Sequence, residues 1–71
     1  MWICGKLYGY RVECKVFSVG SKWGIDGGKI SKLCIRDGAG RWVVNYDRGW
    51  DVKPDGDDVI QVYNEVIRRY N

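Results

Sequence analysis

Polar and apolar residues alternate with a period of two over much of the first two thirds of the chain. The clearest case is YRVECKVF, residues 10–17, and the segments 29–36 and 41–47 repeat it. This period is typical of a strand with one buried face. The stretch WICGKL, residues 2–7, is a weaker example. The pattern therefore predicts about four strands.

Alternation also assigns side chains to faces. It places Leu33 and Ile35 on one face of their strand and Ile30 on the other, and it groups Trp42 with Val44 and Tyr46 on the inner face. The expected outer face carries Arg11, Glu13, Lys15, Phe17, Lys32, Arg36, Arg41 and Asn45. This outer face is mostly basic, with one aromatic side chain.

Short connections rich in Asp and Gly separate the strand segments. Residues 37–40, DGAG, and residues 26–28, DGG, tolerate the positive φ angles that tight turns require. Antiparallel neighbours are the natural consequence. The stretch SVGSKWGI, residues 18–25, leaves two alternatives open: a short extra strand, or an ordered loop with Trp23 folded inward.

After Pro54 the period changes to that of a helix. The apolar stripe comprises Val59, Val62, Tyr63, Val66, Ile67 and Tyr70. Asp55 is the expected N-cap, with Asp58 in the position that a capping box favours, while Arg68 and Arg69 complement the dipole at the other end. The sequence predicts a helix over residues 56–70.

Neither a half-buried sheet nor an amphipathic helix can bury its apolar side alone. The 71 residues, 1–71, are therefore expected to form a single α+β domain. It consists of an antiparallel sheet of about four strands within residues 1–50 and one C-terminal helix packed on one face. The other face is left open to water, as antiparallel sheets allow.

Charge is unevenly distributed along the chain. The net charge is +3, but residues 1–36 carry +5 and residues 37–71 carry −2. A balance of this size bears on solubility and loose attraction, not on the fold. It falls short of the strongly basic footprint of a dedicated nucleic-acid binder.

The chain lacks the residues of common catalytic centres. It has no His, which excludes Ser/His/Asp and Cys/His arrangements. Trp23 stands where a GxxxxGK phosphate loop needs its first glycine, and DGAGRWV does not complete GxGxxG. The sequence predicts a protein that is not an enzyme and has no cofactor.

The three cysteines show no metal-binding spacing. We expect three reduced, mostly buried thiols, with Cys4 facing Cys14 across a hairpin as the alternative. Four carboxylates near the helix start could attract calcium, but they also suit helix capping, and no metal is predicted. These are Asp51, Asp55, Asp57 and Asp58. No apolar run spans a bilayer and no signal peptide is evident, so the expected location is the cytoplasm.

The run NYDRGWD, residues 45–51, concentrates charges and aromatics. In one interpretation it is a corner, where Gly49 takes a positive φ and lets Trp50 pack against the sheet edge or the helix. Arg48 would then sit between Asp47 and Asp51 in an exposed ion-pair cluster. In the alternative, these residues form a recognition surface with Trp50 as its anchor.

Two motifs carry a resemblance to a known family. GIDGGKISKLCIRD, then NYDRGWD, a proline and a short helix ending in RRYN, resemble small uncharacterised proteins of Firmicutes and their phages or mobile elements. The resemblance covers residues 24–71. It implies a bacterial, intracellular setting and transfers no activity and no catalytic residues.

The sequence does not establish a function. We expect a non-enzymatic module that binds another protein through the open sheet face or the Arg48 and Trp50 corner. The first alternative is a nucleic-acid-binding accessory that uses the basic face, and the second is an inhibitor of a host protein. No membrane partner is expected, and the oligomeric state stays open.

Overall fold

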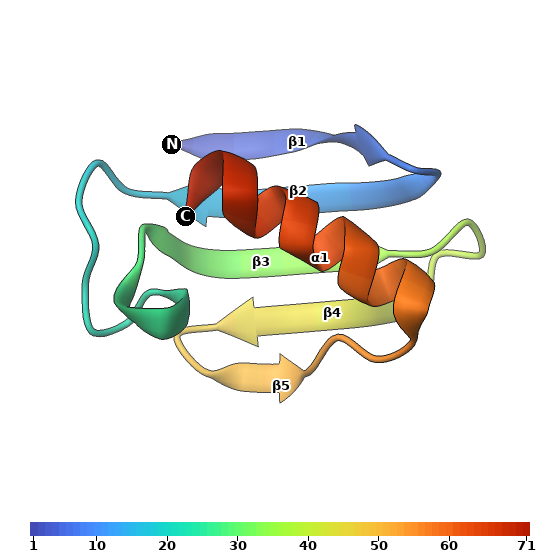
Figure 1. Cartoon of the computed structure of the whole chain (residues 1–71). Coiled ribbons are helices and arrows are strands. Elements are labelled where there is room, and N and C mark those ends of the chain that lie inside the picture. The colour runs from blue at the N-terminus through green and yellow to red at the C-terminus, as the bar shows by residue number, and fades with distance from the viewer.

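A five-stranded antiparallel sheet with one helix across it forms the architecture of the computed structural model, which describes all residues from 1 to 71. The strands follow one another in the order β1-β2-β3-β4-β5 (Figure 1). The elements are β1 (Trp2–Leu7), β2 (Tyr10–Val16), a 3-10 turn η1 (Ile25–Gly27), β3 (Ile30–Arg36), β4 (Trp42–Asp47), β5 (Trp50–Val52) and α1 (Asp57–Tyr70). The predicted α+β class is confirmed, with five strands where about four were expected.

The turn between β1 and β2 is the tightest connection of the sheet. Leu7 pairs with Tyr10, which leaves only Tyr8 and Gly9 between the strands. Their φ angles are 53° and 81°. Positive φ at both central residues matches the right-handed twist of the flanking strands. This turn fixes the register of β1 on β2.

Three residues interrupt the sheet as bulges. The register shifts once in each of the pairings β2–β3, β3–β4 and β4–β5. The residues left without a partner on the neighbouring strand are, in the same order, Ser31, Val43 and Asp51. An unpaired residue advances its strand by one position, so side chains beyond it change face relative to simple alternation. The pairing of β1 with β2 has no such shift.

The bulges correct two of the predicted face assignments. Ile30, expected on the outer face, is fully buried in the core because Ser31 is the extra residue beside it. Trp42, expected inside, pairs with Arg36 on the outer face because Val43 takes up the extra position. Val43 packs against the core instead.

The helix covers one face of the sheet, as predicted. It runs diagonally, from the start of β4 and the end of β5 toward β1 and β2 (Figure 1). Val59, Val62 and Val66 are buried against strand residues such as Leu33 and Ile35. None of the helices has both the length and the apolar character that crossing a bilayer requires.

The helix start differs from the prediction. The N-cap is Gly56, not Asp55, and no side chain caps the first turn. Gly56 has φ 83° and ψ 150°, a conformation that L side chains rarely adopt. The chain therefore enters α1 through a glycine-specific bend, and Asp57 and Asp58 lie in the first turn.

The segment between β2 and β3 is an ordered loop, which settles the open alternatives. Trp23 does not fold inward, since 52% of its surface is exposed, and Ile25 is the buried residue instead. The Trp23 carbonyl accepts a hydrogen bond of 2.9 Å from the Tyr46 hydroxyl. The backbone carbonyl of Trp23, not its indole ring, thus joins this loop to the sheet.

Candidate functional site

The candidate site is the sheet face opposite α1, which we call the open face. The strand register arranges its side chains in three transverse rows. The rows are Lys6, Arg11, Arg36 and Trp42; Cys4, Glu13, Cys34 and Asn45; and Trp2, Lys15, Lys32 and Asp47. Each row crosses β1 to β4 in that order.

The first row places three cations side by side. Lys6 is directly opposite Arg11, and Arg11 is directly opposite Arg36. Neighbouring strands are about 4.8 Å apart, and like charges at opposed positions destabilise a sheet. None of the three forms an ion pair with a carboxylate. The repulsion within this row is therefore not offset by any ion pair.

The row that begins at Trp2 has a third like-charge pair, Lys15 opposite Lys32. Lys32 is partly neutralised by Asp47, whose carboxylate oxygen lies 3.8 Å from the ammonium nitrogen. Lys15 has no carboxylate partner and stands 5.2 Å from the centre of the Phe17 ring. Positive charge thus lies in the two outer rows of the open face, and the middle row between them carries only the charge of Glu13.

Two exposed indoles stand on the open face, and sequence reasoning missed both. Trp2 is 57% exposed on β1, and Trp42 is 49% exposed on β4. The Arg36 guanidinium carbon lies 4.4 Å from the centre of the Trp42 ring. Trp2 and Trp42 both line a shallow hollow of ≈ 200 Å³, together with Lys32 and Arg36. Glu13 and Asp47 line it as well, so the hollow combines aromatic surface with charges of both signs.

The cysteines lie on both faces of the sheet and none forms a disulfide. Cys4 pairs with Glu13 on the open face, whereas Cys14 is fully buried on the helix side, so the alternative in which they face each other is wrong. Burial, with a smaller contribution from Cys4, raises the pKa of the Cys14 thiol to about 11. Burial also raises the pKa of Cys34, although Arg36 opposes this.

The 45–51 corner divides its residues between the two faces. Trp50 packs on the helix side, with ring centres 5.0 Å from Tyr46 and 5.7 Å from Tyr63. Arg48, not Gly49, takes the positive φ, at 56°. The corner interpretation thus describes how this run folds, with the left-handed residue one position earlier than predicted.

The charges of the corner do not form one cluster. Arg48 pairs with Asp47 at 3.6 Å. The Asp51 carboxylate instead accepts a hydrogen bond of 3.1 Å from the Asn45 side chain. Arg48 therefore pairs with Asp47 and not with Asp51, so the expected cluster around Arg48 does not form.

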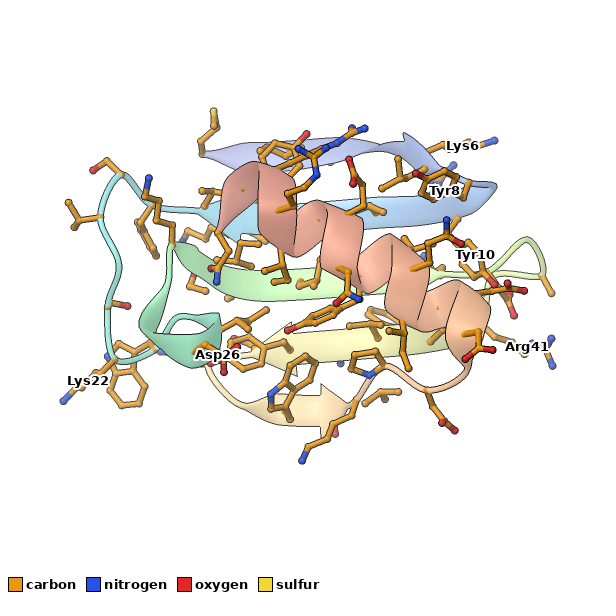
Figure 2. All side chains as sticks on the ribbon, viewed as in Figure 1. Lys6, Tyr8, Tyr10, Lys22, Asp26 and Arg41 are labelled. Atoms are coloured by element: carbon orange, nitrogen blue, oxygen red, sulfur yellow. The ribbon has the colours of Figure 1, made fainter.

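The structure brings together Arg11, Lys15, Lys32 and Arg36 as predicted, and it removes Arg41 from the group. Arg41 precedes β4 and its Nε donates to the Asp37 carboxylate at 3.0 Å. Figure 2 shows Lys6 and Arg41 at the same end of the sheet, Lys6 on the first hairpin and Arg41 beside the loop between β3 and β4. Lys6 and Trp2 follow the alternation of WICGKL, which is the signal that could have identified them.

Comparison with known proteins places the chain in a family. No curated protein and no solved structure matches it. Nowhere do three or more Cys, Asp or Glu side chains gather closely enough to hold a metal ion. The expected resemblance to an uncharacterised family began at residue 24, whereas the family match extends over residues 1–71. The chain belongs to the family described as a domain of unknown function, DUF7678.

Proposed function

We propose that this protein is a non-enzymatic binding module whose open face holds single-stranded nucleic acid. The observation that supports this most strongly is the row of Lys6, Arg11 and Arg36, three adjacent cations without carboxylate partners that end at Trp42. Phosphates of a bound strand would supply the missing negative charge.

Electrostatics favours a polyanion over a single charged group. Opposed cations on neighbouring strands repel one another, so the row lowers stability in the free protein. A chain of phosphates removes that repulsion and releases its own counterions on binding. Lys15 continues the positive charge on the far side of Glu13, and it too lacks an ion-pair partner.

Aromatic surface favours single strands over duplexes. Unpaired bases stack on exposed aromatic rings, and each stacked base contributes roughly 1–3 kcal/mol. Trp2 and Trp42 both line the hollow on the open face, one on an outer strand and one next to Arg36. In a duplex the base faces are already stacked on one another. Two indoles separated by cations therefore suit a flexible strand whose bases turn toward the protein.

A protein partner is the second candidate, and two acids on the open face favour it. Glu13 and Asp47 interrupt the positive charge, as in a surface that pairs with mixed charges. Trp and Arg are also the side chains that dominate protein interfaces. Inhibition of a host protein would be one form of this candidate. The bacterial, cytoplasmic setting stays a prediction.

Fluorescence anisotropy with labelled oligothymidine and oligouridine tests the first candidate. With about three phosphates neutralised, log affinity should fall with log salt at a slope of about −2. Arg11→Gln should reduce that slope by about 0.7. The same substitution should leave the fold intact or slightly more stable at low salt, because it relieves repulsion from Lys6 and Arg36.

Matched variants separate stacking from charge. Trp2→Ala and Trp42→Ala should each weaken oligonucleotide binding by about tenfold or more. Trp23→Ala is the control, because Trp23 is equally exposed and has Lys22 4.9 Å from its ring, yet it does not line the hollow. Absence of binding at low salt would reject the nucleic-acid candidate. If Trp2→Ala and Trp42→Ala bind oligonucleotides as tightly as the parent, the stacking role is rejected and only a general attraction to polyanions remains.

A further inference from the structure

The two edges of the sheet are protected to very different degrees. β5 is only three residues long and is soon followed by Pro54, which discourages further strand pairing. β1 has six residues, no proline and no bulge, and Figure 1 shows no element beyond it. Exposed backbone on such a strand is a template for another strand.

The hydrogen-bond pattern shows which residues of β1 face outward. Met1 and Val16 are joined by two backbone hydrogen bonds. The Val16 N–H donates to the Met1 carbonyl at 2.8 Å, and the Met1 amino group donates to the Val16 carbonyl at 2.9 Å. Bonded and non-bonded pairs alternate along an antiparallel ladder. The pairs of Trp2, Cys4 and Lys6 with β2 are therefore non-bonded, and their N–H and C=O groups point away from the sheet.

We propose that β1 pairs antiparallel with β1 of a second copy, about a two-fold axis at Cys4. This register makes Cys4 oppose Cys4 of the partner and Trp2 oppose the partner's Lys6. It joins all the outward-facing residues of both strands and aligns residues 1–7 over their whole length. Two five-stranded sheets become one continuous sheet, with both helices on the same face.

Side chains on both faces of β1 are self-complementary in this register. On the open face, each Lys6 ammonium meets the exposed indole of the partner's Trp2, a favourable cation–π pair. On the helix side, Ile3 opposes the partner's Gly5, where a Cβ would meet no atom within 4 Å. Gly5 and Ile3 also line a small hollow, ≈ 70 Å³, between β1 and the end of α1. The partner's Ile3 would fill it.

Exposure along β1 supports the same conclusion. Met1 and Trp2 are among the large apolar side chains left exposed in the single chain. In the dimer Met1 lies beside the partner's Leu7, which is itself only half-buried. Registers centred on Ile3 or Gly5 would shorten the overlap and leave an outward residue unpaired. The Cys4-centred register is the one that uses the complete edge.

Sedimentation equilibrium under reducing conditions tests the dimer. The apparent mass should rise from 8.2 kDa toward twice that value as protein increases from about 10 µM to about 1 mM. Cys4→Pro should remain monomeric with an unchanged circular dichroism spectrum, because proline removes a donor that points away from the sheet. Cys4→Ala keeps the donor and should dimerise like the parent. A parent that stays monomeric, or a Cys4→Pro variant that still dimerises, would overturn the proposal.

Thiol crosslinking of two folded cysteine variants tests the register. In the Cys34→Ser variant, a short bismaleimide should join two chains through Cys4, because Cα atoms of a bonded pair are about 5.5 Å apart. The Cys4→Ser variant should give no crosslinked dimer, since two Cys34 residues would be separated by five strand spacings, about 24 Å. A dimer that fails to crosslink through Cys4 would contradict this register. Both readouts are independent of nucleic-acid binding.

Discussion

Asn71 is hydrogen-bonded to Ile30, 41 residues earlier in the chain. Its side-chain oxygen accepts from the Ile30 backbone N–H at 2.9 Å, and its side-chain nitrogen donates to the Ile25 carbonyl at 3.1 Å. The side-chain amide of Asn71 thus binds the Ile25 carbonyl before the pair Gly27 and Gly28 and the Ile30 N–H after it. The end of α1 fixes the loop that precedes β3.

Asn71→Ala should lower the free energy of unfolding by about 1–3 kcal/mol, because it leaves the partly buried Ile30 N–H without a partner and removes one of the two hydrogen bonds that the Ile25 carbonyl accepts. Asn71→Asp keeps the acceptor for Ile30 but loses the donor, so its loss should be intermediate. Urea denaturation measures both. Asn64→Ala, on the exposed side of α1, is the control, and an equal loss there would argue against a specific role for Asn71.

Trp50→Ala should destabilise the protein by roughly 1–3 kcal/mol. Trp50 makes an edge-on contact with Tyr46 and a tilted contact with Tyr63, which links β5 to β4 and α1. Its surface is 37% exposed, so the loss should be below that of a fully buried Trp. Thermal and urea unfolding measure the change. Trp2→Ala, which lies outside the core, should change stability much less, and a reversed order would contradict this placement.

Arg48→Gly should stabilise the fold by about 0.5–1 kcal/mol. Arg48 has φ 56°, which costs a residue with a Cβ more than it costs glycine. The substitution removes only an exposed ion pair with Asp47, and such pairs contribute little. Lys53→Gly is the comparison, because Lys53 is exposed and has no positive φ. Loss of stability in Arg48→Gly equal to that in Lys53→Gly would show that the turn is unstrained.

Cys14 should make the protein less stable at alkaline pH. Its pKa is raised from 9.0 to about 11, so between these values the unfolded chain loses a proton that the folded chain keeps. The contribution of Cys14 to the free energy of unfolding is therefore fully present below pH 9. It is lost as the pH rises toward 11, by roughly 2–3 kcal/mol in all. Cys14→Ala should lack this component when unfolding free energies are compared from pH 8 to pH 11. At pH 8 iodoacetamide should modify Cys4 and spare Cys14; equal rates would contradict the burial.

Local patterns were enough to predict most of the fold. The period of two placed Leu33 and Ile35 in the core, and the helical period placed Val62 and Val66 against them. Both periods are properties of consecutive residues, since the backbone geometry of a strand or a helix decides which side chains share a face. The basic character of the open face followed from the same alternation at Arg11, Lys15, Lys32 and Arg36.

The bulges could not be predicted in this way. Ile30 enters the core and Trp42 leaves it because Ser31 and Val43 find no partner on the adjacent strands. Whether a strand accommodates an extra residue depends on its neighbour's hydrogen bonds and on which side chain fits the core.

The sequence by itself determined four of the five strands, the helix and their order, together with the mostly basic character of the open face, because these depend on neighbouring residues; β5 was not predicted. Only the tertiary structure decided that Trp42 joins Arg36, that Arg48 takes the left-handed turn position, and that Asn71 reaches Ile30. Each of these depends on strand register or on contacts between residues distant in sequence. Such contacts carry no periodic signal along the chain.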